Sequence, residues 1–537
     1  MKSSKPWQSL YPDSISIELN IPDLSLPQLL QETAKKYPSH PAVSFYGRKT
    51  SYLELHRMSE AFASALQQNG IQKGDRVAIM LPNCPHYIIS YYGILSAGAI
   101  VTQINPMSVE RELHHLLNDS GAETIIAFGD FLPRVEAVRK ETNLKKVIAV
   151  AFQTPAAKPD GAVLFEDFLK SGNGTAGGIT VDPKEDTAVL QYTGGTTGRS
   201  KGAMLTHRNL VANVLQSYEF FKFDLSFGKE RCLTVIPLFH VFAMTSCMNL
   251  SIFLGAEMIL LPRFDLEEVL RTIKTEQPTL FPGVPTMYVA LTNHPNAEEY
   301  GIDSIEICNS GSAPMPVELL REFERKTGSR ILEGYGLSEA APVTHCNPSF
   351  AERKPGTVGI PFPSTDYKIV DTATGNDELP PGELGEVIVR GPQVMKGYWN
   401  LPEETANVLR DGWLYTGDIG LMDVEGYLSV VDRKKDMIIA SGFNIYPRDI
   451  EEVLYEHPSV QEAVVIGVPH AYRGETIKAV LVLKNGREAD EEEIQAFCRT
   501  NLASYKVPEI IEFRSQLPKT SVGKILRRAL REEITAK

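Results

Sequence analysis

The clearest chemical signal in the sequence is a short loop, Tyr192–Gly202, which reads YTGGTTGRSKG. Glycines let a backbone approach phosphate oxygens closely and turn its N–H groups toward them. Threonine and serine hydroxyls add hydrogen-bond donors, and Lys201 adds a positive point charge. A flexible surface turn is the less favoured interpretation. A Walker A loop is excluded, because Ser200 stands where its last glycine would be and Gly202 where its final Ser or Thr would be. The loop therefore predicts a site for a phosphate-bearing ligand.

The elements that position this loop are predicted by an alternation of helical and strand-like patterns. Residues 53–69 have helical periodicity, and residues 77–81 form the apolar run VAIML. Further strand-like runs, each flanked by helical patterns, occur at residues 99–101, 124–128, 146–150, 258–261 and 305–310. This rhythm predicts an α/β fold with layered, largely parallel sheets.

The pattern changes after Gly356. Strand-like runs at 366–370, 385–390 and 427–431 alternate with turn residues and predict a β-rich subdomain. The charged stretch 432–436 is expected to break the chain, and the patterns beyond it predict an α+β domain of about a hundred residues. These later patterns are helical at 449–457 and 490–500 and strand-like at 461–468 and 479–483. We expect a large N-terminal domain, residues 1–434, and a small, mobile C-terminal domain, residues 435–537.

Composition narrows the class of protein. The 537 residues are 43% hydrophobic and 23% charged, which is typical of a globular protein with at least two domains. The net charge of -13, from 54 basic and 67 acidic residues, argues against nucleic acid as the main partner. No run approaches the roughly 20 apolar residues of a membrane span, and no apolar stretch follows the first basic residues as in a secretory signal.

The six cysteines lie far apart, with no paired spacing. This disfavours a zinc ribbon and a disulfide framework and fits a reducing cytoplasm. We therefore expect a cytoplasmic protein. No amphipathic basic helix marks a membrane anchor, although a fatty acid substrate would favour transient membrane contact. The oligomeric state is left open, a homodimer included.

The loop and the motifs that follow it resemble those of the adenylate-forming (ANL) superfamily, which includes acyl-CoA synthetases, peptide-synthetase adenylation domains and firefly-type luciferases. The resemblance extends from about Ser51 to Lys524, with the motifs in family order. Relatives usually have Pro where this chain has Ser200, a change that leaves the phosphate-facing positions intact. By resemblance, the loop holds the β- and γ-phosphates of ATP through Thr193, Gly194, Gly195, Thr196, Thr197, Gly198 and Lys201.

Two further segments resemble the family's adenine and magnesium sites. The motif at 333–339, EGYGLSE, implies that Tyr335 stacks on adenine, that Ser338 reaches the α-phosphate, and that Glu339 binds Mg²⁺ together with Thr193. Taken alone, Tyr335 would more often be a core residue and Glu339 a solvated charge. The motif SGSAP at 310–314 resembles the loop on the other face of the adenine. The nucleotide-binding positions implied here are Ser310, Gly311, Ser312, Ala313, Glu333, Gly334, Tyr335, Gly336 and Ser338.

The C-terminal motifs imply a moving domain that carries a catalytic lysine. By resemblance, Asp418 and Arg433 hold the ribose, and Lys435 is the hinge. The strand containing Ser441, Gly442 and Phe443 is similar to the one that lines the pantetheine tunnel for coenzyme A. Lys524 resembles the lysine that bridges the substrate carboxylate and the α-phosphate in the transition state. The neighbouring cations Lys519, Arg527 and Arg528 are expected to be solvated.

His240 occupies the position of the family's histidine beside the substrate carboxylate. A lone histidine in an apolar run is more often a packed core residue, and its expected role is that of a gate and orienter. The catalytic residues implied by the resemblance are thus Lys524, His240, Glu339 and Lys201. The acyl pocket is expected to include His240, Gly283, Val284, Gly311 and Gly336.

The implied activity is an ATP-dependent ligase that converts a carboxylic acid into an acyl-adenylate and then into its coenzyme A thioester, with Mg²⁺ as cofactor. Amino-acid-activating relatives carry an Asp that is absent beside His240, and acetate-activating relatives fill the position of Gly336 with Trp. An apolar tail contributes about 0.8 kcal/mol per buried CH₂, so an open pocket favours long chains. The segments 281–286 and 392–399 resemble those of bacterial long-chain fatty acid–CoA ligases.

Other classes remain as alternatives. They are a medium-chain or aryl acid–CoA ligase, an acyl-adenylate ligase that loads a carrier protein, a light-emitting oxygenase and a non-catalytic binding protein. The last would be expected to lack Lys524, Glu339 or the phosphate loop, and all three are present.

Overall fold

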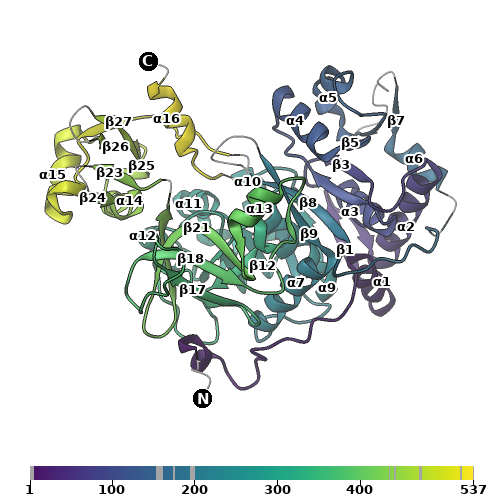
Figure 1. The fold of residues 1–537 in the computed structure, drawn as a ribbon, viewed down its shortest axis with the longest axis horizontal. Helices are drawn as coiled ribbons and strands as arrows, with labels where there is room; N and C mark the ends of the chain where they lie inside the picture. Colours follow the sequence, from purple (N-terminus) through teal and green to yellow (C-terminus); the bar gives the residue numbers. More distant parts are fainter. Residues whose placement is uncertain are drawn as a thin grey trace.

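A computed structural model describes residues 5–152, 161–172, 174, 176–193, 200–434, 436–440, 443–470, 474–520 and 523–535. Figure 1 shows two α/β layers and a β-rich subdomain together, with the C-terminal elements in a smaller lobe to one side. The predicted α/β fold with a β-rich subdomain and a C-terminal α+β domain is confirmed.

The first sheet carries the predicted phosphate loop. Within the described residues its strand order is β19-β9-β8-β4-β3-β5-β6-β7, parallel from β8 to β7. The strands are β3 (Arg76–Met80), β4 (Ile100–Gln103), β5 (Thr124–Phe128), β6 (Lys146–Val150), β7 (Ala162–Leu164), β8 (Thr187–Thr193), β9 (Lys201–Thr206) and β19 (Gly397–Tyr398). Its helices are α2 (Tyr52–Gln68), α3 (Pro85–Ser96), α4 (Glu110–Ser120), α5 (Leu132–Arg139) and α6 (Phe165–Ser171).

Local sequence explains these elements. The strands of this sheet are continuous apolar runs such as residues 124–128, as expected when helices cover both faces of a parallel sheet. The helix α2 begins with a capping box, because the Glu54 N–H donates to Ser51 Oγ at 3.3 Å and the Ser51 N–H donates to Glu54 Oε2 at 2.8 Å.

The second sheet has the order β16-β15-β14-β13-β12-β10-β11-β1-β2 and is parallel from β14 to β1. Its strands are β1 (Pro41–Phe45), β2 (Arg48–Ser51), β10 (Arg231–Thr234), β11 (Glu257–Leu260), β12 (Leu280–Gly283), β13 (Ile307–Ser310), β14 (Ile331–Gly336), β15 (Val343–Cys346) and β16 (Ile360–Pro361). Associated helices are α1 (Leu26–Lys36), α7 (His207–Phe221), α8 (Val241–Ala243), the π-helix η3 (Met244–Asn249), α9 (Leu250–Leu254), α10 (Leu266–Glu276), α11 (Pro285–Asn293) and α12 (Val317–Thr327). One hydrophobic core runs continuously through both sheets.

The β-rich subdomain contains β17 (Asp366–Val370), β18 (Gly385–Arg390), β20 (Leu409–Arg410), β21 (Trp413–Met422) and β22 (Leu428–Arg433), with α13 (Pro402–Val408) beside it. The expected break at 432–436 begins later than its charges suggested. Asp432 and Arg433 continue β22, because the long strand β21 offers them ladder partners in Ile419 and Asp418.

The C-terminal lobe has its own sheet and its own apolar clusters. Its elements are β23 (Ile438–Ala440), β24 (Phe443–Ile445), α14 (Pro447–Glu456), β25 (Val460–His470), β26 (Gly474–Leu483), α15 (Glu491–Asn501), β27 (Ile510–Phe513) and α16 (Arg527–Thr535). The hinge Lys435 lies outside the described residues, so the division at 434/435 stays a prediction. Across the described residues, no helix combines the length and apolar character needed to cross a membrane.

Candidate active site

The phosphate loop lies in the chain between β8 and β9, which pair antiparallel. Thr193 pairs with Lys201 across the hairpin, and the Ser200 hydroxyl donates to the Thr193 carbonyl. The Ser200 carbonyl lies 3.0 Å from Nε2 of His115 on α4. The base of the loop is therefore fixed from two sides. Gly194, Gly195, Thr196, Thr197 and Gly198 lie outside the described residues, and their phosphate contacts stay predictions.

Lys201 projects from the start of β9 toward two groups of the segment between β18 and β20. Its ammonium forms an ion pair with Glu404 of α13, and it lies 5.2 Å from the centroid of the Tyr398 ring. The side chain of Glu404 is about half exposed, so an incoming phosphate could replace it as the partner of Lys201.

Glu339 lies in the short 3₁₀ helix η6 (Ser338–Ala340), which follows β14. The Tyr398 hydroxyl donates to Glu339 Oε1 at 2.7 Å. Among the described residues nothing donates to Oε2, and no cluster of three metal-ligating side chains occurs. This donor set fits Mg²⁺, which commonly takes one or two carboxylates from the protein and further oxygens from substrate phosphates and water.

The predicted ribose site is assembled from three elements. The Tyr335 hydroxyl of β14 donates to Asp418 Oδ2 at 2.6 Å, and Nε of Arg433 lies 3.2 Å from Asp418 Oδ1. Burial, reinforced by the Asp418 carboxylate, raises the pKa of Tyr335, so its hydroxyl remains a donor. Asp418 is 5% exposed. The strand pairing of β21 with β22 places Asp418 directly opposite Arg433.

The two adenine segments follow neighbouring strands, because Ser310 of β13 pairs with Glu333 of β14. Ser310 Oγ is buried and has no hydrogen-bond partner among the described residues, while Ser312 takes a left-handed backbone conformation at φ 68°. The buried Glu333 accepts a 3.0 Å hydrogen bond from the Met315 N–H, and burial raises its pKa to about 7. Glu333 thus supports the loop from beneath, and its direct contact with nucleotide stays a prediction.

Two of the glycines predicted in the acyl pocket have packing reasons as well. A Cβ at Gly336 would lie 2.2 Å from the Pro342 carbonyl oxygen, and one at Gly283 would lie 2.8 Å from the Tyr288 ring. Both glycines are therefore required by close neighbours, independently of any ligand.

Lys524 lies in a tight loop of the C-terminal lobe. The Lys524 N–H donates to Thr520 Oγ1 at 3.1 Å, and the Thr520 N–H donates back to the Lys524 carbonyl at 2.7 Å. Gly523 takes φ 78° and its carbonyl accepts a 3.5 Å contact from the Thr286 hydroxyl of α11. The loop thus packs against the large domain.

The electrostatics of Lys524 and His240 show that these two groups share one environment. Although the Lys524 side chain reaches solvent, surrounding protein lowers its pKa to about 8, and Arg433 adds to the effect. Burial lowers the pKa of His240 to about 4, with a further contribution from the charge of Lys524. His240 Nδ1 accepts a 3.3 Å hydrogen bond from the Phe242 N–H, which fixes the ring at the start of α8. The imidazole is therefore neutral near pH 7 and fits an orienter rather than a cation.

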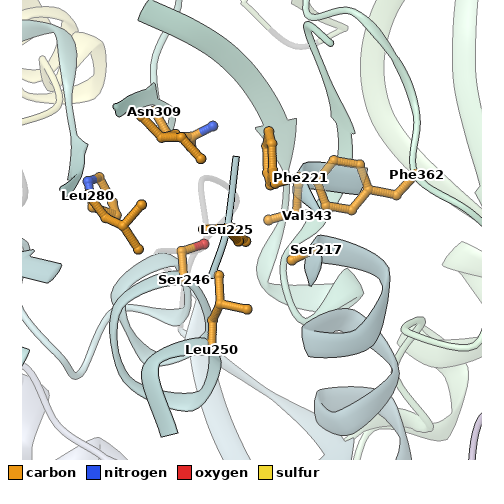
Figure 2. Close-up of a pocket in the computed structure, with 11 residues that line it drawn as sticks. Ser217, Phe221, Leu225, Ser246, Leu250, Leu280, Asn309, Val343 and Phe362 are labelled. Atoms are coloured by element: carbon orange, nitrogen blue, oxygen red, sulfur yellow. The ribbon is translucent and has the colours of Figure 1, made fainter. Parts of the chain in front are cut away.

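An apolar cavity of the large domain lies among α7, η3, α9 and the strands β12, β13 and β15 (Figure 2). It is lined by Ser217, Phe221, Leu225, Ser246, Leu250, Leu280, Pro282, Ile307, Asn309, Val343 and Phe362. Pro282 precedes Gly283, Asn309 precedes Ser310, and Val343 pairs with Gly336. The cavity therefore extends inward from the strands that carry the expected acyl pocket. The sequence analysis did not predict these lining residues, because isolated apolar residues on strands and helices cannot be distinguished from ordinary core residues.

The comparisons with known proteins agree with this geometry. The family model for "AMP-binding enzyme" matches residues 30–399, and that for "AMP-binding enzyme C-terminal domain" matches residues 449–524. The chain belongs to the AMP-binding enzyme family. The resemblance to the adenylate-forming superfamily is thereby confirmed.

Relatives of this AMP-binding enzyme align along its whole length. A Bacillus subtilis (strain 168) protein named long-chain-fatty-acid–CoA ligase is 49% identical over 556 residues, covering 100% of this chain and 99% of its own. The crystal structure of ATP-bound MatB from Rhodopseudomonas palustris has a TM-score of 0.85 at 32% identity, covering 95% of this chain and 99% of that chain. The anthranilate CoA ligase AuaEII in complex with anthranoyl-AMP has a TM-score of 0.87 at 27% identity, covering 96% and 98%.

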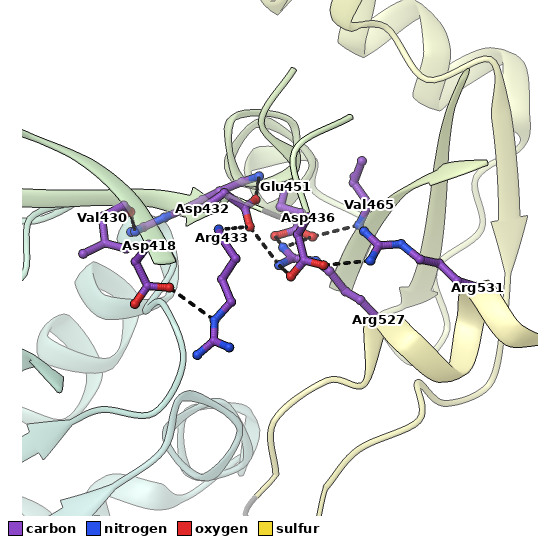
Figure 3. A network of polar contacts seen from close by, with 10 residues as sticks. Asp418, Val430, Asp432, Arg433, Asp436, Glu451, Val465, Arg527 and Arg531 are labelled. Carbon is purple, nitrogen blue, oxygen red and sulfur yellow. Dashed lines mark hydrogen bonds and ion pairs between the residues drawn. The ribbon is translucent and has the colours of Figure 1, made fainter. Parts of the chain in front are cut away.

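Arg527 of the AMP-binding enzyme is not solvated, contrary to the expectation from its position near the chain end. Figure 3 shows it within a network that joins α16 to α14 and β22. Its Nη2 lies 2.7 Å from both carboxylate oxygens of Glu451, and its Nη1 lies 3.4 Å from Asp432 Oδ1. The structural cause is that α16 packs onto β25 within one apolar cluster of the lobe. Lys519 and Arg528, also expected to be solvated, form ion pairs on the surface.

Other contacts of the enzyme join the lobe to the large domain. The Arg448 guanidinium donates to the Val430 carbonyl, and the Arg448 N–H donates to Asp432 Oδ2 at 3.3 Å. Asp432 is buried, which raises its pKa to about 6. These contacts hold the lobe in the orientation that places Lys524 near His240.

The predicted coenzyme A strand cannot be placed in full. Lys435, Ser441 and Gly442 lie outside the described residues. Phe443 begins β24, where it pairs with Ala440 of β23. The hinge and the pantetheine tunnel therefore stay predictions.

Proposed function

We propose that this chain is an ATP-dependent ligase that activates a long-chain fatty acid to acyl-AMP with release of pyrophosphate, and then transfers the acyl group to coenzyme A. The observation that supports this most directly is that the loop of Lys524, from the C-terminal lobe, packs against Thr286 of the large domain and lines one pocket together with Ser312 and Ala313 of the expected adenine segment. The relative named long-chain-fatty-acid–CoA ligase supports the same reaction class.

Adenylation needs positioning and charge neutralisation more than covalent help from the protein. The acid's carboxylate attacks the α-phosphorus, and the bond from that phosphorus to pyrophosphate breaks. The Lys524 ammonium stabilises the charge on the α-phosphate and the incoming carboxylate, while Lys201 stabilises the departing pyrophosphate. Neutral His240 orients the carboxylate without neutralising it. Mg²⁺, when bound through Glu339, supplies further positive charge to the phosphates.

Thioester formation needs Lys524 to leave. Its loop packs against Thr286 of the large domain, and we expect the lobe to rotate before a thiol reaches the acyl carbonyl. We propose rotation about Lys435, after which the strand of Ser441, Gly442 and Phe443 lines the path of coenzyme A. The thiol then attacks the carbonyl and AMP departs.

The apolar cavity favours a long hydrocarbon substrate. Each CH₂ removed from water contributes about 0.8 kcal/mol, and few polar groups line the cavity. An aryl acid is the second candidate, because the structure of an anthranilate CoA ligase has a TM-score of 0.87 with this chain. A medium-chain acid and a carrier protein in place of coenzyme A remain further alternatives.

The decisive experiment is pyrophosphate release with acids of graded chain length and with an aryl acid, each with and without coenzyme A. We expect pyrophosphate with long-chain acids and a thioester only when coenzyme A is present. No pyrophosphate with any carboxylic acid would refute adenylation. Adenylation without thioester would favour the carrier-protein alternative.

A further inference from the structure

One tyrosine contacts both groups that would hold the phosphates and the metal ion of ATP. Tyr398 is the second residue of β19, a two-residue strand at the edge of the first sheet. It lies between Glu339, which follows the second sheet, and Lys201, which begins β9.

The hydroxyl of Tyr398 fixes the carboxylate of Glu339. The O–H donates to Oε1 at 2.7 Å, and Tyr398 is 8% exposed. A charged acceptor makes this hydrogen bond a strong one. One carboxylate oxygen is thereby held while the other stays available to a cation.

The ring of Tyr398 supports Lys201. The ammonium lies 5.2 Å from the ring centroid, within the range of a cation–π contact. Glu404 supplies the counter-charge from α13, only a few residues after β19. Tyr398 therefore contacts Lys201 through its face and Glu339 through its edge.

The backbone holds Tyr398 to the strand that carries Lys201. Tyr398 pairs with Ala203 of β9, and the next residue, Trp399, donates its N–H to the Gly202 carbonyl at 2.8 Å. The Tyr398 N–H donates to Thr405 Oγ1 at 2.9 Å. The ring and hydroxyl thus have a fixed frame relative to the base of the phosphate loop.

We propose that Tyr398 is a positioning residue that sets the metal-binding carboxylate of Glu339 and the phosphate-binding ammonium of Lys201 at a fixed separation. This inference rests on the proposed function, because it assigns a metal ion and phosphates to that same site. It adds a residue that acts through others and does not itself touch the reacting atoms.

Two variants of Tyr398 distinguish the contribution of its hydroxyl from that of its ring. Tyr398→Phe keeps the ring, so the Mg²⁺ concentration for half-maximal pyrophosphate release should rise about tenfold, as expected for one hydrogen bond to a charged group. Calorimetry of ATP binding without any carboxylic acid should show the same shift in Mg²⁺ dependence, with Mg²⁺-free ATP binding unchanged. Tyr398→Leu should also weaken Mg²⁺-free ATP binding, because Lys201 loses the ring.

The matched control is Tyr427→Phe, which removes a hydroxyl that donates to the Glu352 carbonyl at 2.6 Å, away from this site. It should leave the Mg²⁺ dependence unchanged. An unchanged Mg²⁺ midpoint in Tyr398→Phe, or an equal shift in Tyr427→Phe, would overturn the proposal. A wild-type chain that binds ATP with Mg²⁺ but adenylates no acid would instead refute the proposed function, since the calorimetric comparison does not depend on turnover.

Discussion

The carboxylate of Glu452, on α14, accepts a 3.3 Å hydrogen bond from the backbone N–H of Val317, the first residue of α12. The residue before it is Pro316, whose side chain cannot cap a helix. The C-terminal lobe therefore supplies an N-cap to a helix of the large domain, and the proposed rotation of the lobe would remove that cap.

Glu452→Ala should weaken the lobe orientation seen here. A lost cap costs about 1 kcal/mol, so adenylation should fall several-fold while thioester formation from supplied acyl-adenylate is spared. Amide exchange at Val317 should become faster. The control Asp265→Ala removes the cap of α10, where Asp265 accepts from the Glu268 N–H at 3.0 Å within the large domain. If Glu452→Ala and Asp265→Ala changed the ratio of adenylation rate to thioester-formation rate by the same amount, a role for Glu452 in lobe docking would be contradicted.

Lys524→Ala should separate the two half-reactions more sharply. We expect adenylation to fall by about 10²- to 10³-fold, as when other charge-stabilising donors are removed. Thioester formation from supplied acyl-adenylate should remain nearly normal, because Lys524 has by then withdrawn. Lys519→Ala, which loses only a surface ion pair with Glu462, serves as the control. Equal loss of both half-reactions would count against lobe rotation.

The pH dependence of adenylation should reflect Lys524. Its pKa is lowered to about 8, so the ammonium is present below that pH and is lost as the pH rises through it. The value of kcat/KM for adenylation, which reports the free enzyme, should therefore be level below about pH 8 and decline above it. In Lys524→Arg the decline should disappear, because a guanidinium keeps its proton. His240, with a pKa of about 4, should add no inflection near pH 7.

We expect the Asp418 carboxylate to accept hydrogen bonds from the ribose hydroxyls of ATP. Asp418→Ala should raise the KM for ATP and remove most of the wild-type preference for ATP over 2′-deoxy-ATP. Tyr335→Phe should have a smaller effect in the same direction, because it removes only the 2.6 Å hydrogen bond that orients Asp418. A preference for ATP that survives intact in Asp418→Ala would show that the ribose lies elsewhere.

A larger side chain in the cavity should shift the substrate preference of the enzyme to acids with shorter chains. Ser246→Leu places a larger side chain among Leu250, Leu280 and Ile307. Each CH₂ that no longer enters forfeits about 0.8 kcal/mol, close to fourfold in kcat/KM. The maximum of the chain-length profile should move to shorter acids while ATP binding and melting temperature stay near the wild type. An unmoved maximum would place the hydrocarbon tail outside this cavity.

Patterns in the chain predicted the regular elements well where burial alone decides them. Residues 124–128 and 146–150 are strands with those bounds, because each is an apolar run buried on both faces. The resemblance assigned Asp418 and Arg433 to one ribose site, and the structure brings the two side chains within 3.2 Å of each other, while ribose binding itself stays a prediction. Charge misled at Asp432 and Arg527, where a long partner strand and a returning helix bury groups that look solvated in the sequence.

Features that depend on residues distant in the chain could not be predicted. The hydrogen bond from Tyr398 to Glu339 joins residues separated by 59 positions, and the cavity lining comes from helices and strands spread over the large domain. No local pattern encodes such contacts. Gly336 shows the same limit, because its need for a bare backbone comes from Pro342, which reaches it only in the folded chain.

Asp432 and Arg433 are consecutive on β22, so their side chains leave the strand in opposite directions. Arg433 reaches Asp418, and Asp432 reaches Arg448 and Arg527 of the lobe. If Asp418 and Arg433 hold the ribose as proposed, nucleotide affinity and lobe docking would be linked through one strand, and such a linkage is reciprocal. If docking of the lobe raises the affinity for AMP by some factor, bound AMP raises the equilibrium constant for docking by the same factor. Departure of AMP would then release the lobe, which would let the enzyme reset after each turnover.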